Sequence, residues 1–493
     1  METMAQIKAF RGLRFDTAKA GDIGSLTCPP YDIISEEQRK AYLEANPHNV
    51  IRLELPREGE DPYEEAGRVL GEWKKEGILK RDEKESLYIY EEEFTVKGVT
   101  RKVKGVICLV KLTPFSEGVV LPHEFTLSKA KTDRYNLMKS TFCNFSQIYS
   151  LYMDDGNTRI LLDSQSAGAP AQEFTDKSGV THRLWLVTDP AVLAVLSRQF
   201  ADRKLYIADG HHRYETALKF RDDCREKGLS KPGDGTDYVM MMLVDMAHPG
   251  LVVFPTHRLV RDLPDFDPAA ALQKCKEYFE VSPRPSLATL DEELTALYDA
   301  GKKAFGFYDG GEGWTLLTLK DTLVMDKLLP DVSPASRTLD VTVLHTLVLE
   351  RLFGIDKENM QNQKNLTYVK LEKEAVDAVR KGEAQCAFLL NPTRVTEIRD
   401  VAAAGEKMPQ KSTYFYPKLI TGLVMNELRK RGTGFPAVPT RAAKNAYKKG
   451  ARFSAPPFLF AAREMHRRFA EKGTQARKAS CETKRTYFSP RLV

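Results

Sequence analysis

The sequence lacks the features that mark membrane-spanning, disulfide-rich and zinc-binding proteins. No window of its 493 residues approaches the roughly eighteen uninterrupted apolar residues of a membrane span. Residues 1–10 have no apolar run or small-residue cleavage site, so we expect no signal peptide. The seven cysteines lie far apart and never form a CxxC pair, which argues against a disulfide framework and a structural zinc site. We therefore expect reduced thiols in a cytoplasmic protein that has no membrane partner.

The charge of the chain is concentrated at one end. Residues 429–493 contain 17 Lys and Arg against three Asp and Glu, so the overall net charge of +6 leaves about −8 for residues 1–428. We expect this basic tail, 429–493, to be disordered. It could contact nucleic acid or simply be solvated, whereas the acidic remainder argues against DNA binding.

The pattern of apolar residues predicts an α/β fold without internal repeats. Apolar runs and period-two alternation favour strands, whereas caps and amphipathic spacing favour helices. The expected strands are 7–15, 50–55, 86–96, 101–112, 119–122, 146–153, 181–187, 204–208, 238–245, 250–254 and a hairpin of 304–308 with 314–319. One expected helix begins at Ser35. The other expected helices span 62–73, 126–138, 190–200, 212–227, 268–278 and 288–300.

A turn between a strand and a helix carries the strongest chemical signal, Asp209-Gly210-His211-His212-Arg213. The start of a helix exposes unpaired N–H groups that suit phosphate oxygens, and glycine lets the backbone approach closely. Arg213 offers a fork of donors, and the two histidines could become charged near neutral pH. Asp209 could hold Mg²⁺ or polarise a substrate hydroxyl. The alternative is a turn whose polar residues only cap the helix.

A second motif, Pro122-His123-Glu124, precedes a predicted helix. Glu124 could remove a proton from an alcohol, with His123 beside it. It is not the zinc motif HExxH, because Leu127 stands where the second histidine would be. An exposed turn before a helix explains the same residues. Further along, Lys129, Lys131 and Arg134 could line an anion pocket or form a solvated helix face.

Three weaker motifs follow. In residues 405–418, Gln410 replaces the glycine of a Walker loop, yet Lys411, Ser412 and Thr413 could contact phosphate from the start of a helix, or form a capped helix without a ligand. In residues 181–183 and 255–258, we interpret the histidine of each as structural.

Several of these motifs together resemble a bacterial and archaeal family known as domain of unknown function 1015. The resemblance covers about residues 7–428. It is carried by Pro29-Pro30-Tyr31-Asp32, Pro122-His123-Glu124, Leu205 to Ala217, Pro255-Thr256-His257-Arg258 and Met408 to Thr413.

That family resembles the free serine kinases, and the resemblance implies a ParB/sulfiredoxin-like core with additional α/β lobes. The implied divisions are an N-terminal lobe, 1–115, a catalytic core, 116–262, a C-terminal lobe, 263–428, and the basic tail. The implied reaction is phosphorylation of free L-serine to O-phosphoserine, within serine metabolism. Pyrophosphate, ADP or ATP would be the donor, with Mg²⁺ as cofactor.

Carried over by position, the resemblance makes Glu124 the catalytic base, with His123 beside it. It places Asp209 at the metal or the serine hydroxyl. It makes Gly210, His211, His212 and Arg213 the residues that hold the phosphoryl group. The motif at 405–418, interpreted from the residues themselves, adds Lys411, Ser412 and Thr413 to the predicted phosphate-binding residues.

Two functions of other classes remain open. The phosphate motif also partly fits a ParB-like nucleotide-binding regulatory protein without catalysis. The basic tail could instead make the chain a nucleic-acid-associated protein.

Overall fold

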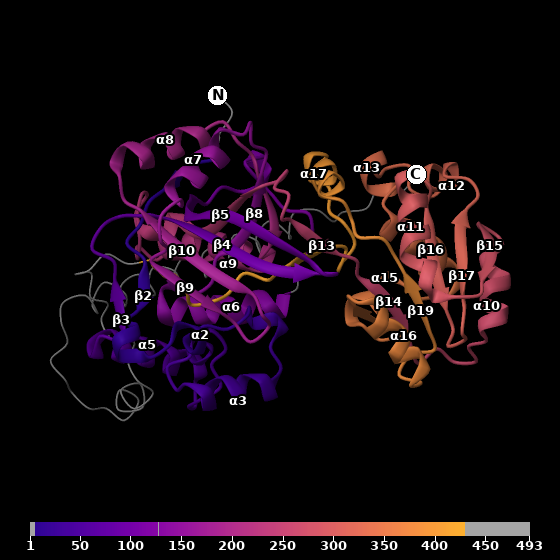
Figure 1. Ribbon diagram of the computed structural model, residues 1–493, viewed down its shortest axis with the longest axis horizontal. Coiled ribbons are helices and arrows are strands. Elements are labelled where there is room, and N and C mark those ends of the chain that lie inside the picture. Colours follow the sequence, from indigo (N-terminus) through magenta and orange to yellow (C-terminus); the bar gives the residue numbers. More distant parts are fainter. Residues whose placement is uncertain (1–4, 127, 429–493) are drawn as a thin grey trace, which may run out of the picture. The chain divides into compact units, whose positions relative to one another are not determined.

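The computed structural model describes residues 5–126 and 128–428. They form helices and several β-sheets (Figure 1). This confirms the predicted α/β class. The predicted basic tail lies outside the described residues. Within them, every helix is too short or too polar to cross a membrane. Their six cysteines are buried free thiols, as expected.

The larger sheet has nine strands. Its strand order is β6-β11-β8-β12-β5-β4-β10-β9, and β1 also pairs with β5. A long hairpin, β4 (Leu87–Val96) and β5 (Val99–Lys111), runs through its middle. The remaining strands are β1 (Ile7–Lys8), β6 (Val120–Leu121), β8 (Ile148–Tyr152), β9 (Gln172–Thr175), β10 (Thr181–Val187), β11 (Leu205–Asp209) and β12 (Tyr238–Asp245).

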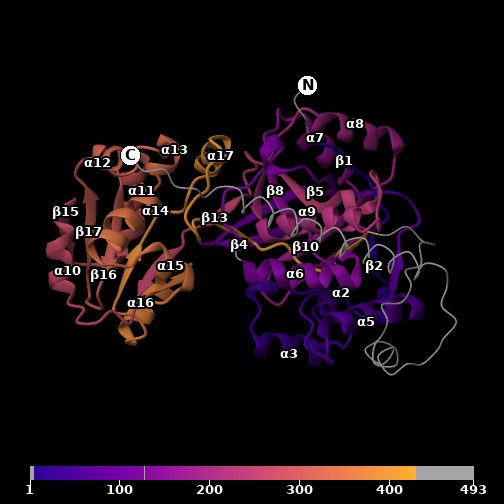
Figure 2. The same ribbon diagram turned by 180° about the vertical axis from the view of Figure 1, so that it is seen from behind.

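Each face of this sheet contributes to a hydrophobic core, and successive side chains of a strand point to opposite faces. Leu87 and Ile89 pack in one core with helices α8 (Pro190–Phe200) and α9 (His211–Glu226). Tyr88 and Tyr90, from the same strand, pack in a second core with α5 (Pro62–Glu76). Helix α6 (Ser128–Thr141) packs against α9, as Figure 2 shows.

Two neighbouring strands of this sheet bring the two strongest sequence motifs together. Strands β6 and β11 are parallel, with Leu121 opposite Tyr206. Because parallel strands end at the same edge of a sheet, the loop that follows β6 and the turn that follows β11 lie side by side. The first carries Glu124, and the second begins with Gly210, directly after Asp209, the last residue of β11.

A second sheet of six strands follows in the chain, with the order β15-β17-β16-β19-β14-β18. The chain then returns to the first part. Strand β20 (Tyr414–Tyr416) pairs with β13 (Val252–Phe254), and the N–H of Met408 donates to the carbonyl of His123 at 2.7 Å. The six strands are β14 (His257–Val260), β15 (Phe279–Arg284), β16 (Ala304–Tyr308), β17 (Trp314–Leu319), β18 (Leu366–Val369) and β19 (Cys386–Leu389).

Local signals in the sequence fix several of these elements. Ser35 and Gln38 form a capping box at the start of α3 (Glu36–Ala45). Asp61 caps α5, which has Pro62 in its first turn and ends at the left-handed Gly77. The hairpin of β16 with β17 also forms where predicted.

The predicted strand at 50–55 is wrong. These residues form a short helix, α4 (Ile51–Glu54), whose first N–H donates to the side chain of Asn49 at 2.9 Å. The alternation of apolar and charged residues in this segment is typical of a half-buried strand. Instead Glu54 is buried, accepts from the Ser146 hydroxyl at 3.0 Å and pairs with Arg134 at 3.3 Å.

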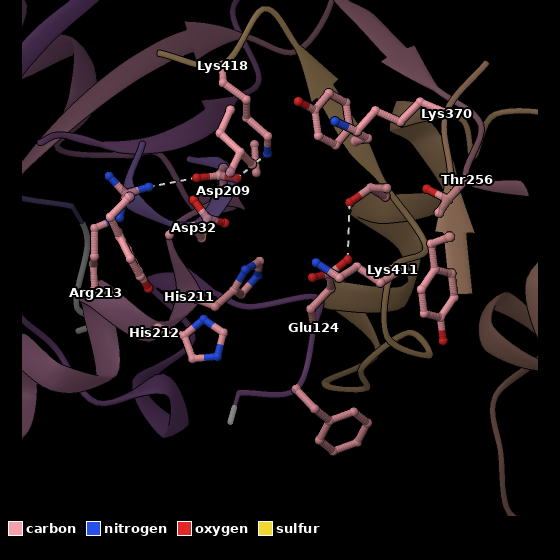
Figure 3. Close-up of a pocket in the computed structure, with 18 of the residues that line it drawn as sticks. Asp32, Glu124, Asp209, His211, His212, Arg213, Thr256, Lys370, Lys411 and Lys418 are labelled. Carbon is pink, nitrogen blue, oxygen red and sulfur yellow. Dashed lines mark hydrogen bonds and ion pairs between the residues drawn. The ribbon is translucent and has the colours of Figure 1, made fainter. Parts of the chain in front are cut away.

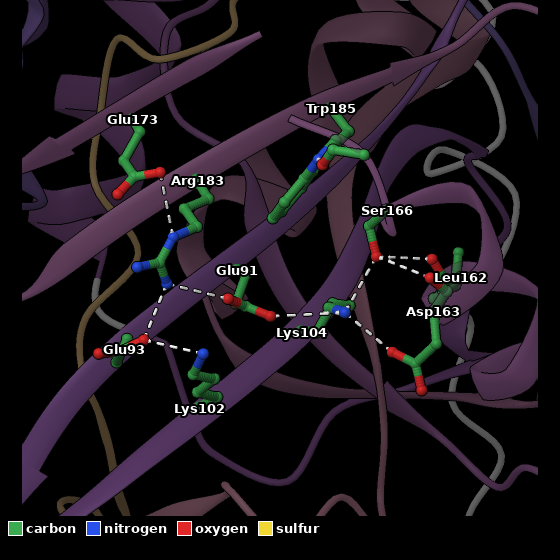
Figure 4. Close-up of polar contacts among 11 residues, drawn as sticks. Glu91, Glu93, Lys102, Lys104, Leu162, Asp163, Ser166, Glu173, Arg183 and Trp185 are labelled. Atoms are coloured by element: carbon green, nitrogen blue, oxygen red, sulfur yellow. Dashed lines mark hydrogen bonds and ion pairs between the residues drawn. The ribbon is translucent and has the colours of Figure 1, made fainter. Parts of the chain in front are cut away.

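Strands β5, β4, β10 and β9 of the larger sheet carry a ladder of ion pairs (Figure 4). We call it the sheet ladder. On the face that carries Ile89, Glu91 and Glu93 lie opposite Lys104 and Lys102, and Arg183 of β10 contacts both glutamates at 3.1 and 2.9 Å. Each charge of the ladder has an opposite charge next to it. The ladder consists of Glu91, Glu93, Lys102, Lys104, Asp163, Glu173 and Arg183.

Candidate active site

Gly210 joins β11 to α9 and shapes the turn that opens the helix. Its φ of +99° lies in the left-handed region, which favours glycine. A Cβ atom at this position would also lie 2.9 Å from Nη2 of Arg213. Helix α9 begins at the next residue, His211. Its first backbone N–H groups are therefore at the end of the strand, where the sequence predicts phosphate binding.

Asp209 is held between two cations. Its Oδ2 accepts from Nη2 of Arg213 at 2.6 Å, and its Oδ1 accepts from the ammonium group of Lys418. Burial alone would raise the pKa of Asp209, but Lys418 and Arg213 together lower it well below its usual value. Burial would likewise lower the pKa of Lys418, yet the charge of Asp209 raises it. The pair therefore stays ionised near neutral pH.

This pairing bears on magnesium. Mg²⁺ requires oxygen ligands with free lone pairs in near-octahedral geometry. Both oxygens of Asp209 already accept from cations, and the described residues contain no group of three His, Cys, Asp or Glu that could hold a metal. The residues around Asp209 in this conformation do not fit a protein-bound magnesium ion.

Arg213 is largely occupied within the protein. Besides Asp209, its guanidinium group donates to the carbonyl of Gln147 at 2.6 Å and to the hydroxyl of Ser146 at 3.1 Å. The sequence suggested that its fork of donors faces phosphate. In the structure, most of that fork fixes the end of β11 and the start of β8.

The two histidines of the turn stay neutral, contrary to the expectation that they become charged. Burial lowers the pKa of His211 well below its usual value and also lowers that of His212. His211 accepts the N–H of His123 at its Nε2, 3.2 Å away, so its proton is on Nδ1. His211 can thus donate one hydrogen bond into the site without carrying charge.

His123 is completely buried behind the wall of the site. Its Nδ1 lies 2.7 Å from the carbonyl of Ile207, which can only accept, so Nδ1 carries the proton. Burial lowers the pKa of His123, which keeps Nε2 unprotonated as an acceptor for the Thr413 hydroxyl, 3.0 Å away. His123 can therefore act on a substrate only through its neighbours.

This arrangement leaves the carboxylate of Glu124 available. Thr413 lies 3.4 Å from Glu124 Oε1 but has a single proton, and His123 Nε2 is the closer acceptor. No Lys or Arg of the described residues forms an ion pair with Glu124. Its main chain is fixed by a bridge to Met408.

These groups line one cavity of about 390 Å³ (Figure 3). Glu124 and Asp209 both face it, so the two strongest motifs of the sequence do meet. The cavity also receives side chains from the region 363–370 and from the segment 411–418. Its polar and aromatic lining includes Tyr31, Asp32, Glu124, Asp209, His211, His212, Arg213, Thr256, Tyr368, Lys370, Lys411, Thr413, Tyr414 and Lys418.

The segment 411–413 differs from its prediction. No helix begins here, because β20 follows directly and Lys411 has a left-handed φ of +56°. Lys411 and Thr413 line the cavity. Ser412 does not; it is buried and donates to the carbonyl of Pro409 at 2.5 Å. The fully buried Arg258 donates to the carbonyl of Lys411 at 3.1 Å, which fixes this turn.

Other predicted basic and histidine residues lie elsewhere. Lys129, Lys131 and Arg134 do not line the cavity; Lys131 pairs with Glu215 at 2.8 Å. The histidines interpreted as structural are so: His182 contacts Tyr90 and Asp176, and the buried His257 accepts from the N–H of Leu390.

Three charged residues of the cavity were not predicted as part of the site. Asp32 follows two prolines in a motif that carried the family resemblance. Lys418 ends the segment 405–418, but nothing in the sequence links it to Asp209. No motif in the sequence marks Lys370, which follows a short strand more than 150 residues after Asp209. Burial, together with the nearby charge of Lys418, lowers the pKa of Lys370, whose ammonium group lies 3.7 Å from the centre of the Tyr414 ring.

Comparison with known structures gives low similarity throughout. A conserved hypothetical protein from Pyrococcus furiosus is 15% identical, with a TM-score of 0.31 over 63% of this chain and 92% of its own. A mutant free serine kinase in complex with ADP is 13% identical, with a TM-score of 0.33 over 63% of this chain and 89% of its own. SbnI from Staphylococcus aureus, truncated at its C-terminus, is 11% identical, with a TM-score of 0.31 over 69% of this chain and 97% of its own. Similarity at this level assigns no activity.

Sequence comparison is more specific. Among curated proteins, none matches the chain. The profile of a family described as "Protein of unknown function (DUF1015)" matches residues 7–342, more than half of the sequence. The same stretch contains the Pro-His-Glu and Asp-Gly-His-His-Arg motifs that line the cavity. The chain therefore belongs to the DUF1015 family.

Proposed function

We propose that this protein is a phosphotransferase that moves a phosphoryl group to the hydroxyl of a small acceptor, free L-serine. One observation carries the proposal: a carboxylate without a cationic partner, Glu124, shares a cavity with Lys370, Lys411 and the start of α9. Phosphoryl transfer requires positioning and neutralisation of charge more than covalent chemistry. A base, two lysines and helix N–H groups are the parts that it needs.

Glu124 acts as the general base in this proposal. Its free oxygen accepts the proton of the serine hydroxyl while the hydroxyl oxygen forms a bond to phosphorus. The bond between phosphorus and the bridging oxygen of the donor breaks, and the electron pair leaves on that oxygen with the leaving group, which is phosphate from pyrophosphate, AMP from ADP or ADP from ATP. His123 positions the base indirectly, because it holds the Thr413 proton away from the carboxylate.

The phosphates of the donor lie among the cations in this proposal. Lys370 and Lys411 form no ion pair with a described carboxylate, so their charges remain available for phosphate. The N–H groups that follow Gly210 and the Nδ1–H of His211 add neutral donors. Lys418 and Arg213 serve mainly to hold Asp209.

The resemblance of the motifs to those of free serine kinases supports serine as the acceptor and pyrophosphate, ADP or ATP as the donor. The expected Mg²⁺ would have to come with the donor phosphates, since Asp209 does not offer it a free oxygen. No step above depends on it.

The test is to incubate the full chain and Mg²⁺ with L-serine and, separately, with pyrophosphate, ADP and ATP, and to follow O-phosphoserine by phosphorus NMR. We expect product with one of these donors and almost none with the Glu124→Gln variant. Tight nucleotide binding without product from any donor would overturn the proposal and favour the regulatory alternative.

A further inference from the structure

Three carboxylates of the described residues line the cavity, and the proposed reaction assigns no role to one of them, Asp32. Asp209 is paired with Lys418 and Arg213, and Glu124 is the proposed base. Asp32 is exposed, and no hydrogen bond or ion pair joins its side chain to another described residue. A carboxylate that faces a cavity without a partner is suited to a cationic group of a ligand.

The backbone around Asp32 is firmly held, although its side chain is free. Asp32 lies in the short 3₁₀ turn Tyr31–Ile33, directly after Pro29 and Pro30. The guanidinium group of Arg134 lies 3.9 Å from the centre of the Tyr31 ring, and Arg134 is itself buried against Glu54. The cation–π contact and the prolines therefore fix where the Asp32 carboxylate enters the cavity.

Among the charges of the cavity that form no ion pair, Asp32 lies on one side and Lys370 on the other. Figure 3 shows Asp32 on the side of Asp209 and Arg213, whereas Lys370 and Thr256 lie on the opposite side with Lys411 next to Glu124. Lys370 and Lys411 attract an anionic phosphate donor and repel a cation. A cationic group of the acceptor is therefore drawn toward Asp32, whose carboxylate has no hydrogen bond or ion pair with another described residue.

We propose that Asp32 binds the α-ammonium group of the acceptor and so selects acceptors that carry an amino group next to the hydroxyl. This rests on the proposed function, since it assigns the acceptor side of the same cavity. A divalent metal is the other cation that a carboxylate could take. Without the donor phosphates, the described residues contain no group of three His, Cys, Asp or Glu that could hold such an ion, so the two ligands are separated by experiment.

A kinetic comparison of Asp32→Asn with the wild type tests this contact. Loss of one charge-assisted hydrogen bond should raise the KM for L-serine about 10- to 100-fold and change kcat less. Ethanolamine keeps the amino group, and 3-hydroxypropionate lacks it. The inhibition constant of ethanolamine against L-serine should therefore rise in the variant, whereas that of 3-hydroxypropionate should stay the same. Asp202→Asn, an exposed aspartate outside the cavity, is the matched control and should behave as wild type.

Two outcomes would overturn the assignment of Asp32. One is an unchanged KM for L-serine. The other is an equal loss of affinity for 3-hydroxypropionate, together with a KM that recovers at high Mg²⁺, which would identify a metal ligand instead.

Failure of the proposed function is recognised separately, because wild-type protein would then give no O-phosphoserine with any donor. Calorimetric titration of L-serine into wild type and Asp32→Asn, without donor and in EDTA, tests the contact independently of turnover. Weaker binding by the variant would support the assignment, and equal affinities would overturn it.

Discussion

Two regions of this protein are built from the same charged residue types but differ in how the charges are matched. In the sheet ladder, Arg183 contacts Glu91 and Glu93, and every other charge also has an opposite neighbour (Figure 4). In the cavity, Asp209 is matched by Arg213 and Lys418, whereas Lys370, Lys411 and the carboxylates of Asp32 and Glu124 have no ion-pair partner of opposite charge among the described residues (Figure 3).

The difference separates structural charge from charge that is available to a ligand. Exposed ion pairs contribute little stability each, and they leave no charge free for a ligand. Unmatched charges that share a cavity are unfavourable for folding. Their presence therefore indicates another role, such as binding or catalysis. Substitutions in the two regions should therefore affect different measurements.

The largest effect should come from Glu124→Gln, which removes the proposed base and keeps the shape of the side chain. We expect kcat for O-phosphoserine formation to fall roughly 100- to 10,000-fold, with an unchanged melting temperature. Glu277→Gln, at an exposed position outside the cavity, is the control. A Glu124→Gln enzyme that keeps more than a tenth of the wild-type rate would remove Glu124 from the reaction.

Asp209→Asn should mainly affect stability, although Asp209 faces the cavity. It leaves the largely buried Lys418 ammonium without its counter-charge, which should cost about 3 kcal/mol of the free energy of unfolding. Because the pKa of Asp209 is lowered in the folded state, this loss should be complete above pH 3.8 and should shrink as the pH falls further. Chemical denaturation at several pH values measures it.

The double variant Asp209→Asn with Lys418→Met provides the control for this pair. It removes both charges and should be more stable than Asp209→Asn alone. Equal stabilities of the two variants would contradict the assigned pairing.

Lys411→Met should weaken binding of the phosphate donor and leave the fold intact. Methionine replaces the apolar stem of the lysine side chain and removes the ammonium group, so the main change is the loss of the charge. We expect the KM for the donor to rise about 10- to 100-fold. Lys327→Met, an exposed lysine of α12 (Leu323–Leu328), should leave that KM unchanged. A donor KM that is the same in both variants would contradict the role of Lys411.

The smallest effect should come from Arg183→Met at the centre of the sheet ladder. Since its ion pairs are partly exposed, the cost to the free energy of unfolding should be about 1 kcal/mol or less. Enzymatic activity should not change. A large loss of activity without a loss of stability would show that the two regions are not independent.

Several features follow from the sequence because neighbouring residues decide them. The caps at Ser35 and Asp61 satisfy the first N–H groups of their helices locally. Asp209-Gly210-His211 predicts a strand that turns into a helix, because glycine permits the left-handed turn. The motifs around Glu124 and Asp209 could also be identified from the sequence, because each consists of adjacent residues.

Only the tertiary structure decided which charges are matched. Lys418 follows Asp209 by 209 residues, and their pairing depends on the return of the chain through β20. The neutrality of His211 and His212 results from burial, which composition does not reveal. The helix at Ile51–Glu54 likewise depends on distant partners, Arg134 and Ser146, that bury Glu54. Local sequence sets backbone conformation, whereas desolvation and ion pairing depend on residues that the fold brings together.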